Sequence, residues 1–197
     1  MNQFSETINT LVEQTQAHLY IIFIALGVLW FFFLLTLFTN RNLLILGIYP
    51  RQTFGLIGII FAPLLHGSFN HIFFNSIPFC ILSNFILIGG VAFYLNLTFY
   101  LVVLSGLLTW LFSRPALHVG ASGVITGYWS FLMINAYSNS SVISIILAIV
   151  CGYYFAGIFF GIFPFKKGVS WEGHLFGMIS GILLNYGYPY LPQLFTV

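Results

Sequence analysis

The sequence predicts an all-α fold: a polytopic membrane bundle of six transmembrane helices that forms a single domain over residues 1–197. Composition is the first reason, because 60% of the residues are hydrophobic and only 4% are charged, which is unlike soluble globular domains. The second reason is that the few charges divide the chain into apolar stretches of membrane-spanning length. A charge at the centre of a bilayer costs at least about 2.5–3.5 kcal/mol, so the charges mark the loops.

The first span is predicted at Leu19–Phe38, after a short polar tail at residues 1–17. Residues 40–69 follow, and they contain many apolar side chains together with arginines, prolines and glycines. Because these residues interrupt any straight membrane helix, we expect a large interfacial loop between the first and second spans.

Five further spans are predicted, and charges or turn residues bound each of them. A pair of glycines separates the second span from the third, and a turn at Ser138–Ser141 separates the fourth from the fifth. The five spans are Asn70–Ile88, Val91–Phe112, Gly120–Tyr137, Val142–Phe163 and Trp171–Tyr188. With six spans, the second, fourth and sixth begin on the side opposite the N-terminus; we call this side B, and the N-terminal side is side A.

A serine with small neighbours opens the fourth span on side B. Ser122 lies in Gly120-Ala121-Ser122-Gly123, and these small residues let a substrate approach its hydroxyl closely. The N-terminus of a helix also offers unpaired backbone N–H groups, which favour an oxyanion. Taken alone, such a motif in a membrane helix serves close helix packing more often than catalysis, so the motif needs support from other residues.

His174 opens the last span, and Gly177 and Gly181 lie on the same helix face at positions i+3 and i+7. The spacing of these glycines lets two membrane helices touch. If this face packs against Gly123 and Gly127, His174 comes within possible hydrogen-bond reach of Ser122. The alternative is that the glycines serve packing only and that His174 bonds a backbone carbonyl.

His71 and Asn75 lie four residues apart at the start of the second span and therefore share one helix face. An unsatisfied polar side chain in an apolar bundle costs roughly 2–7 kcal/mol, so both residues need partners. They either pair with each other or donate hydrogen bonds to an oxyanion that develops during a reaction.

The other histidines are expected nearer the water. His66, together with Asn70 and Arg114, would line a polar opening on side B through which water reaches the serine. His18 and His118 are expected at a solvated interface.

Several chemistries are disfavoured by what the sequence lacks. It has no aspartate, which excludes a Ser-His-Asp triad and an aspartyl protease, and it has no His-Glu-x-x-His zinc motif. Cys80 and Cys151 lie in apolar runs, which favours buried thiols over a disulfide or metal site. No metal or cofactor is expected, and a net charge of +2 gives no reason to expect nucleic acid.

The whole pattern resembles the rhomboid family of intramembrane serine proteases. Three motifs carry the resemblance, in order and at the right helix starts. They are the entry to the second span with His71 and Asn75, the Gly120-Ala121-Ser122-Gly123 motif of the fourth span, and Gly173-His174-Leu175-Phe176-Gly177 with Gly181 on the sixth. The resemblance covers nearly the whole chain after the first span.

The resemblance implies a Ser–His dyad, with Ser122 as the nucleophile and His174 as the general base. His71, Asn75 and the backbone N–H of Ser122 would form the oxyanion hole. Thr126 stands where many members carry an aromatic residue that stacks on the base. The implied substrates are transmembrane proteins, cleaved in or near their membrane-spanning segments within the lipid bilayer.

Two other functions stay open. A non-catalytic rhomboid-like protein would bind or retain membrane proteins, but its members usually lack the serine or the histidine. A small transporter would need polar residues across the whole membrane, whereas here they gather on side B.

The orientation in the membrane has two conflicting indications. All five Lys and Arg residues lie in loops of side B, so the positive-inside rule places side B in the cytoplasm. The resemblance implies the reverse: a multi-pass protein of a bacterial inner membrane whose active site faces the extracytoplasmic side. We expect the second orientation, because contacts within the loops would hold the arginines in place.

Overall fold

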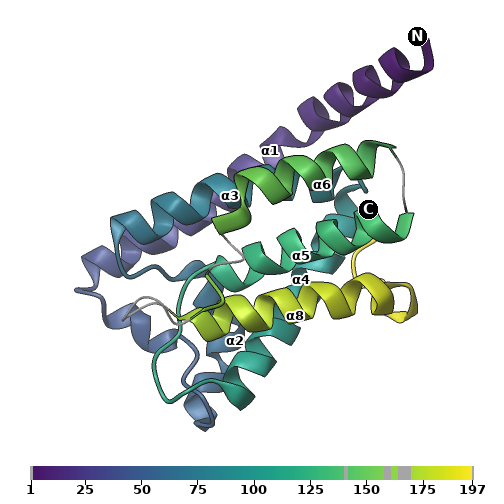
Figure 1. The fold of residues 1–197 in the computed structure, drawn as a ribbon. Helices are drawn as coiled ribbons and strands as arrows, with labels where there is room; N and C mark the ends of the chain where they lie inside the picture. Colours follow the sequence, from purple (N-terminus) through teal and green to yellow (C-terminus); the bar gives the residue numbers. More distant parts are fainter. Residues whose placement is uncertain (1, 140–141, 158–160, 164–169, 197) are drawn as a thin grey trace.

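The computed structural model describes residues 2–139, 142–157, 161–163 and 170–196. Within these ranges the chain is helical apart from turns, loops and one isolated antiparallel bridge between Ile48 and His118, which confirms the predicted all-α class. The long helices are α1 (Asn2–Phe38), α3 (Phe69–Leu87), α4 (Val91–Phe112), α5 (Ser122–Asn139), α6 (Val142–Tyr154) and α8 (Trp171–Gly187) (Figure 1).

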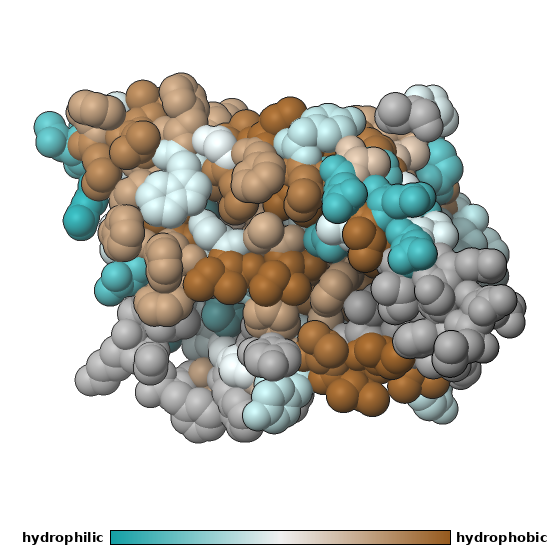
Figure 2. Space-filling model, turned by 90° about the horizontal axis from the view of Figure 1, so that it is seen from above, coloured by the Kyte–Doolittle hydropathy of each residue, from teal (hydrophilic) through white to brown (hydrophobic). Residues whose placement is uncertain are grey.

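Among the residues that the structure describes, three helices are long and apolar enough to cross a membrane. They comprise residues Val12–Phe38 of α1 and the whole of α3 and α4. Many large hydrophobic side chains on these helices are exposed, such as Phe23 and Phe31 on α1 and Phe74 on α3. Hydrophobic residues also cover much of the face seen in Figure 2. Lipid is the solvent that suits such a surface, so the protein is an integral membrane protein.

Several of the predicted helix bounds differ from the observed ones. Helix α1 already begins at Asn2, because the chain before Gly27 contains no glycine or proline to stop it. Helix α5 begins at Ser122 because Gly120 has a φ of 116°, which no right-handed helix accepts. The predicted fifth span ran unbroken to Phe163, but α6 ends at Tyr154, in a stretch that glycines weaken. The end of the Ser138–Ser141 turn lies outside the described residues.

Helix α5 is the centre of the bundle and contacts α3, α4, α6 and α8, most extensively α8 (Figure 1). The α5–α8 contact is close enough to need glycine. A Cβ atom at Gly177 would overlap the carbonyl oxygen of Gly123, and one at Gly181 would overlap the carbonyl oxygen of Gly127. Ser130 of α5 also donates a hydrogen bond to the Met178 carbonyl of α8, at 2.8 Å. The backbones of the two helices therefore touch along two turns.

The segment between α1 and α3 is a compact loop that packs on α4. It contains α2 (Gly58–Phe61) and the 3₁₀ turns Asn42–Leu46, Thr53–Leu56 and Ala62–Leu64. Ile59 of α2 lies against Gly106 of α4, where any side chain would collide with it. The guanidinium of Arg51 donates to the carbonyls of Leu111 (3.1 Å) and Ser113 (2.7 Å) at the C-terminal end of α4. Backbone and side-chain contacts thus fix this loop beside the start of α5.

A buried asparagine fixes the C-terminal segment on the opposite end of α4. Asn96 is completely buried, accepts a hydrogen bond from the Leu194 N–H (2.7 Å) and donates one to the Phe195 carbonyl (2.9 Å). The Asn96 side chain therefore takes the place of a backbone partner for the C-terminal segment.

Candidate active site

One cavity brings together all four side chains that the sequence predicts for the site. It has a volume of about 620 Å³, and its lining includes His71 and Asn75 from α3, Ser122 from α5 and His174 from α8. A second cavity of about 590 Å³ reaches Ser122, Asn75 and His174 from the side of α3 and the end of α6. Residues that are as far apart in the sequence as His71 and His174 thus line the same cavity at one end of the bundle.

Helix capping explains why these side chains lie at the same depth. Helices α3, α5 and α8 all begin at the same end of the molecule (Figure 1). Ser68 accepts a hydrogen bond from the His71 N–H (3.2 Å) at the start of α3, and Ser170 accepts one from the Gly173 N–H (3.4 Å) at the start of α8. Each cap fixes the first turn of a helix, and that turn carries or directly precedes a residue of the cavity.

Gly120 shapes the approach of α5 to α3. Its φ of 116° is accessible to glycine and strained for other residues. A Cβ atom at this position would also collide with the ring of His71. The Gly120 N–H donates to the Ala62 carbonyl at 2.8 Å, so the loop before α3 holds the backbone just before Ser122.

The His174 ring has a defined tautomer. Its Nδ1 lies 3.0 Å from the carbonyl oxygen of Gly161. A carbonyl oxygen only accepts, so Nδ1 carries the proton and Nε2 of the neutral ring keeps a free lone pair. A bond between His174 and a backbone carbonyl was the alternative to a catalytic role. The observed bond occupies only Nδ1, however, and leaves Nε2 able to act as a base. Among the contacts of the described residues, no hydrogen bond joins the Ser122 hydroxyl to this ring.

Thr126 stands where the resemblance implies an aromatic residue, and its hydroxyl bonds within α5. Its hydroxyl donates to the Gly123 carbonyl at 3.0 Å, within the same helix. The side chain is buried where α5 meets Gly177 of α8. The Gly161 carbonyl therefore fixes the His174 ring in this chain, and no sequence motif indicates a backbone group of that kind.

His66 is buried and contacts Asn75 of the cavity, which corrects the expectation of a water-facing position. The side chain is completely buried, and its Nε2 lies 3.1 Å from Asn75 Nδ2 and 3.5 Å from the Ala121 backbone nitrogen. Burial, and secondarily the nearby His71, lower the pKa of His66 from 6.5 to about 4, although the Leu64 backbone acts in the opposite direction. His66 is therefore neutral at physiological pH.

His118 is also buried, and the expectation that it lies at a solvated interface is wrong. Its Nε2 donates to the Arg114 carbonyl, and its Nδ1 forms a short hydrogen bond with the Ser170 hydroxyl. Burial is the main reason why its pKa is lowered. The neighbouring Arg114 guanidinium pairs with the buried Glu172 carboxylate at 2.9 Å. These contacts join the loop before α5 to the start of α8.

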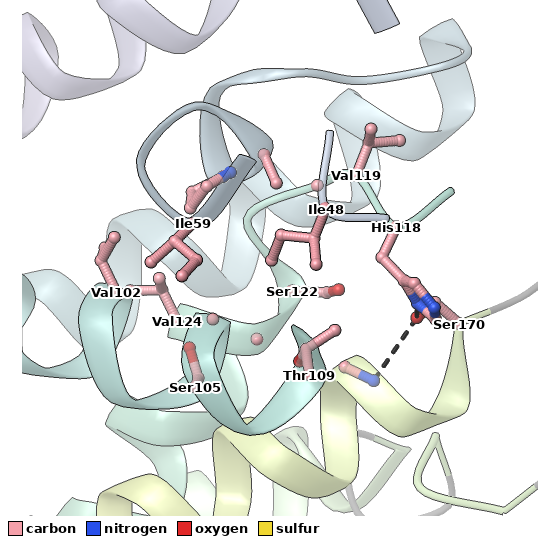
Figure 3. Close-up of a pocket in the computed structure, with 16 residues that line it drawn as sticks. Ile48, Ile59, Val102, Ser105, Thr109, His118, Val119, Ser122, Val124 and Ser170 are labelled. Carbon is pink, nitrogen blue, oxygen red and sulfur yellow. Dashed lines mark hydrogen bonds between the residues drawn. The ribbon is translucent and has the colours of Figure 1, made fainter. Parts of the chain in front are cut away.

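A third, much smaller cavity lies behind Ser122 and is drawn in Figure 3. Its volume of about 40 Å³ has room for one or two water molecules. Polar side chains enter its lining between apolar ones such as Ile48 and Ile59; the polar residues are Ser105, Thr109, His118, Ser122 and Ser170. The serine therefore has polar surroundings on both of its sides.

The fold and the cavity define a helical membrane protein with a polar hollow at one end. Comparison with known proteins identifies its family: a sequence profile of the Rhomboid domain matches residues 53–190. The chain belongs to the rhomboid family.

The chain is also similar to several proteins at moderate identity. The chain is 36% identical over 149 residues to the uncharacterized protein Rv1337 of Mycobacterium tuberculosis, which covers 71% of this chain and 62% of that protein. It is 34% identical to the uncharacterized protein ML1171 of Mycobacterium leprae, over 71% of this chain and 59% of that protein. It is 29% identical to the putative rhomboid protein L523 of Acanthamoeba polyphaga mimivirus, over 70% of this chain and 78% of that protein. The matched region spans about three fifths of the mycobacterial relatives.

Proposed function

We propose that this protein is an intramembrane serine protease that hydrolyses peptide bonds in or near the transmembrane segments of membrane proteins. One observation carries the proposal: Ser122, His174, His71 and Asn75, which come from three helices, line the same cavity. A shared packing role for these residues would not require a hollow between them. Membership of the rhomboid family supports the same reaction class.

The reaction starts with attack of Ser122 Oγ on the substrate carbonyl carbon. His174 Nε2 takes the hydroxyl proton, because Nδ1 is already committed to the Gly161 carbonyl. His174 then gives this proton to the leaving amine, and water releases the acyl group from Ser122 with His174 again as the base. The hydrogen bond between the two side chains forms when substrate fills the cavity, as is common for catalytic pairs that are apart in the free enzyme.

The negative charge on the substrate oxygen needs donors that are already in place. The N–H of Ser122 is one, since the first N–H groups of a helix have no partner within the helix. Asn75 Nδ2 and the His71 ring are the others, because both side chains line the cavity beside Ser122. Donors of this kind are each worth about 10²–10³ in kcat.

We further propose that all six long helices cross the membrane, with side B and the active site facing the extracytoplasmic space. The three shorter helices run beside the three that are clearly long enough (Figure 1). Arg51 and Arg114 oppose this orientation by the positive-inside rule, but both make contacts in the loops of side B. Charges held in this way are poor indicators of orientation.

Cleavage in proteoliposomes tests the proposed function. The purified chain is reconstituted with a panel of single-pass proteins whose transmembrane segments contain small, helix-destabilising residues, and mass spectrometry locates any cut. The expected result is a cut in or near the transmembrane segment that the Ser122→Ala variant does not make. Stable association with these proteins, without a cut by the wild type, would instead favour the non-catalytic binding protein.

A further inference from the structure

His66 contacts three of the groups that surround the proposed oxyanion site. Its Nε2 lies within hydrogen-bond distance of the Asn75 amide nitrogen and of the Ala121 backbone nitrogen, which directly precedes Ser122. Its ring meets the ring of His71 edge to face, with the centroids 4.9 Å apart. His66 itself is completely buried and does not line the large cavity. It can therefore reach a substrate only through these neighbours.

The hydrogen bonds determine the chemical form of His66. A backbone N–H only donates, so the bond from Ala121 requires a lone pair on Nε2 of His66. The amide nitrogen of Asn75 also donates to this lone pair. The ring must then be neutral, with its proton on Nδ1. A protonated ring would set its own N–H against both donors and break both bonds.

The bond to His66 uses one of the two amide hydrogens of Asn75. The second hydrogen stays on a nitrogen whose position is now fixed, and Asn75 lines the cavity with Ser122. The same lone pair holds the backbone at Ala121, so one ring sets the positions of two neighbouring oxyanion donors relative to each other. Preorganised donors stabilise a transition state more than donors that must first be ordered.

We propose that His66 is a positioning residue, which as a neutral imidazole holds the Asn75 amide and the backbone before Ser122 in the geometry of the oxyanion hole. This inference rests on the proposed protease function for its catalytic effect, whereas the contacts and the tautomer stand on the geometry alone. The low pKa of His66 agrees with the neutral form. His71 of α3 is the titratable group that contributes to this shift beside burial.

Two substitutions separate positioning from packing. His66→Gln places an acceptor oxygen near the position of Nε2, whereas His66→Leu fills a similar volume without an acceptor. We expect His66→Leu to lower kcat by about 10–100-fold with little change in KM, and His66→Gln to retain kcat within about 5-fold. His18→Leu removes a histidine of α1 that does not line the large cavity, so it serves as the control and should leave kcat unchanged.

A double-mutant cycle decides whether His66 acts through Asn75. In an Asn75→Ala background, His66→Leu should lower kcat by a clearly smaller factor than in the wild-type background, because one of the two donors that His66 positions is already gone. Equal losses in both backgrounds, or a His66→Gln variant as impaired as His66→Leu, would overturn the proposal. Thermal unfolding of each variant shows whether it is folded.

Nuclear magnetic resonance gives a readout that needs neither activity nor a folded leucine variant. In the ¹⁵N-histidine-labelled wild type, the resonances of His66 are assigned by their loss in His66→Gln. We expect a proton on Nδ1 and an unprotonated Nε2 throughout pH 5.5–8. A proton on Nε2, or titration near pH 6.5, would overturn the positioning role. If Ser122→Ala cleaves as well as the wild type, the protease function fails, and the resonances still test the contacts of His66.

Discussion

Asn75 is the residue whose two roles can be separated most clearly. It donates to His66 with one amide hydrogen, and the proposed reaction uses the other in the transition state. Asn75→Ala should therefore lower kcat by about 10²–10³-fold, while KM changes little because this bond strengthens only as the oxyanion forms. Steady-state kinetics on a cleaved substrate provide the measurement.

Asn84→Ala is the matched control for this substitution. Asn84 lies on the same helix but bonds Thr15 of α1 instead of facing the cavity. The control should keep kcat. A large rise in KM for Asn75→Ala with kcat preserved would mean that Asn75 binds substrate and does not stabilise the oxyanion.

His66 also makes the stability of the protein depend on pH. Its pKa is about 4 in the folded state and ordinarily 6.5, so below pH 6.5 the unfolded chain binds a proton that the folded chain does not. The free energy of unfolding is therefore at its full value above pH 6.5 and falls as the pH drops towards 4, by about 3 kcal/mol at 1.36 kcal/mol per pKa unit.

Thermal unfolding in detergent from pH 4 to 8 measures this effect. Other buried histidines with a lowered pKa, such as His118, also make the protein less stable in this pH range. The informative quantity is therefore the difference between the wild type and His66→Gln. The wild type should lose more stability than the variant as the pH falls. Identical pH profiles would show that His66 titrates normally in the folded protein.

The sequence predicted the residues that line the large cavity better than those that support it. Ser122, His174, His71 and Asn75 stand at helix starts and at helical spacing, and such patterns are visible in one dimension. His66 and His118 precede helices in irregular loops, where no periodicity indicates which way a side chain points. The Gly161 carbonyl was beyond prediction, because every residue carries the same backbone group.

At the scale of elements, the contact between α5 and α8 sets the distance from Ser122 to His174, the proposed nucleophile and base. Gly177→Val would force the helices apart, because even a Cβ atom overlaps the Gly123 carbonyl. A displacement of about 1 Å costs on the order of 10²-fold in a positioned reaction. We therefore expect Gly177→Val to lose cleavage nearly completely, measured beside its thermal unfolding.

Gly187→Val is the control, because a Cβ atom at this last residue of α8 has no neighbour within 4 Å. It should keep both activity and stability. Full activity in Gly177→Val would show that the contact does not position the side chains of the proposed dyad.

The elements themselves follow largely from apolar length and from breakers. The second and third spans were predicted to within one residue of α3 and α4, because charges and glycines bound them closely. The early start of α1 and the early end of α6 were not predicted. Hydrophobicity reports where a membrane lies, whereas a helix continues through polar residues and weakens at glycines.

At the scale of the whole molecule, the proposed orientation places side B outside the cytoplasm, whereas the positions of the Lys and Arg residues favour the reverse. Single cysteines at Ser140 on side A and Lys167 on side B, both outside the described residues, test it after Cys80 and Cys151 are replaced by alanine. We expect an impermeant maleimide to label position 167 but not position 140 on intact cells. The opposite pattern would place the active site in the cytoplasm.

Reaction with a fluorophosphonate is the most direct test of the proposed dyad, because it reports an activated serine without any knowledge of the substrate. We expect the wild type to be labelled and mass spectrometry to locate the label on Ser122. The variants Ser122→Ala and His174→Ala should each lose the label while remaining folded and inserted. The two single losses should be as severe as the double loss, because the dyad acts as one unit. Labelling of His174→Ala above a few per cent of the wild-type rate, or a label on another serine, would contradict the claim.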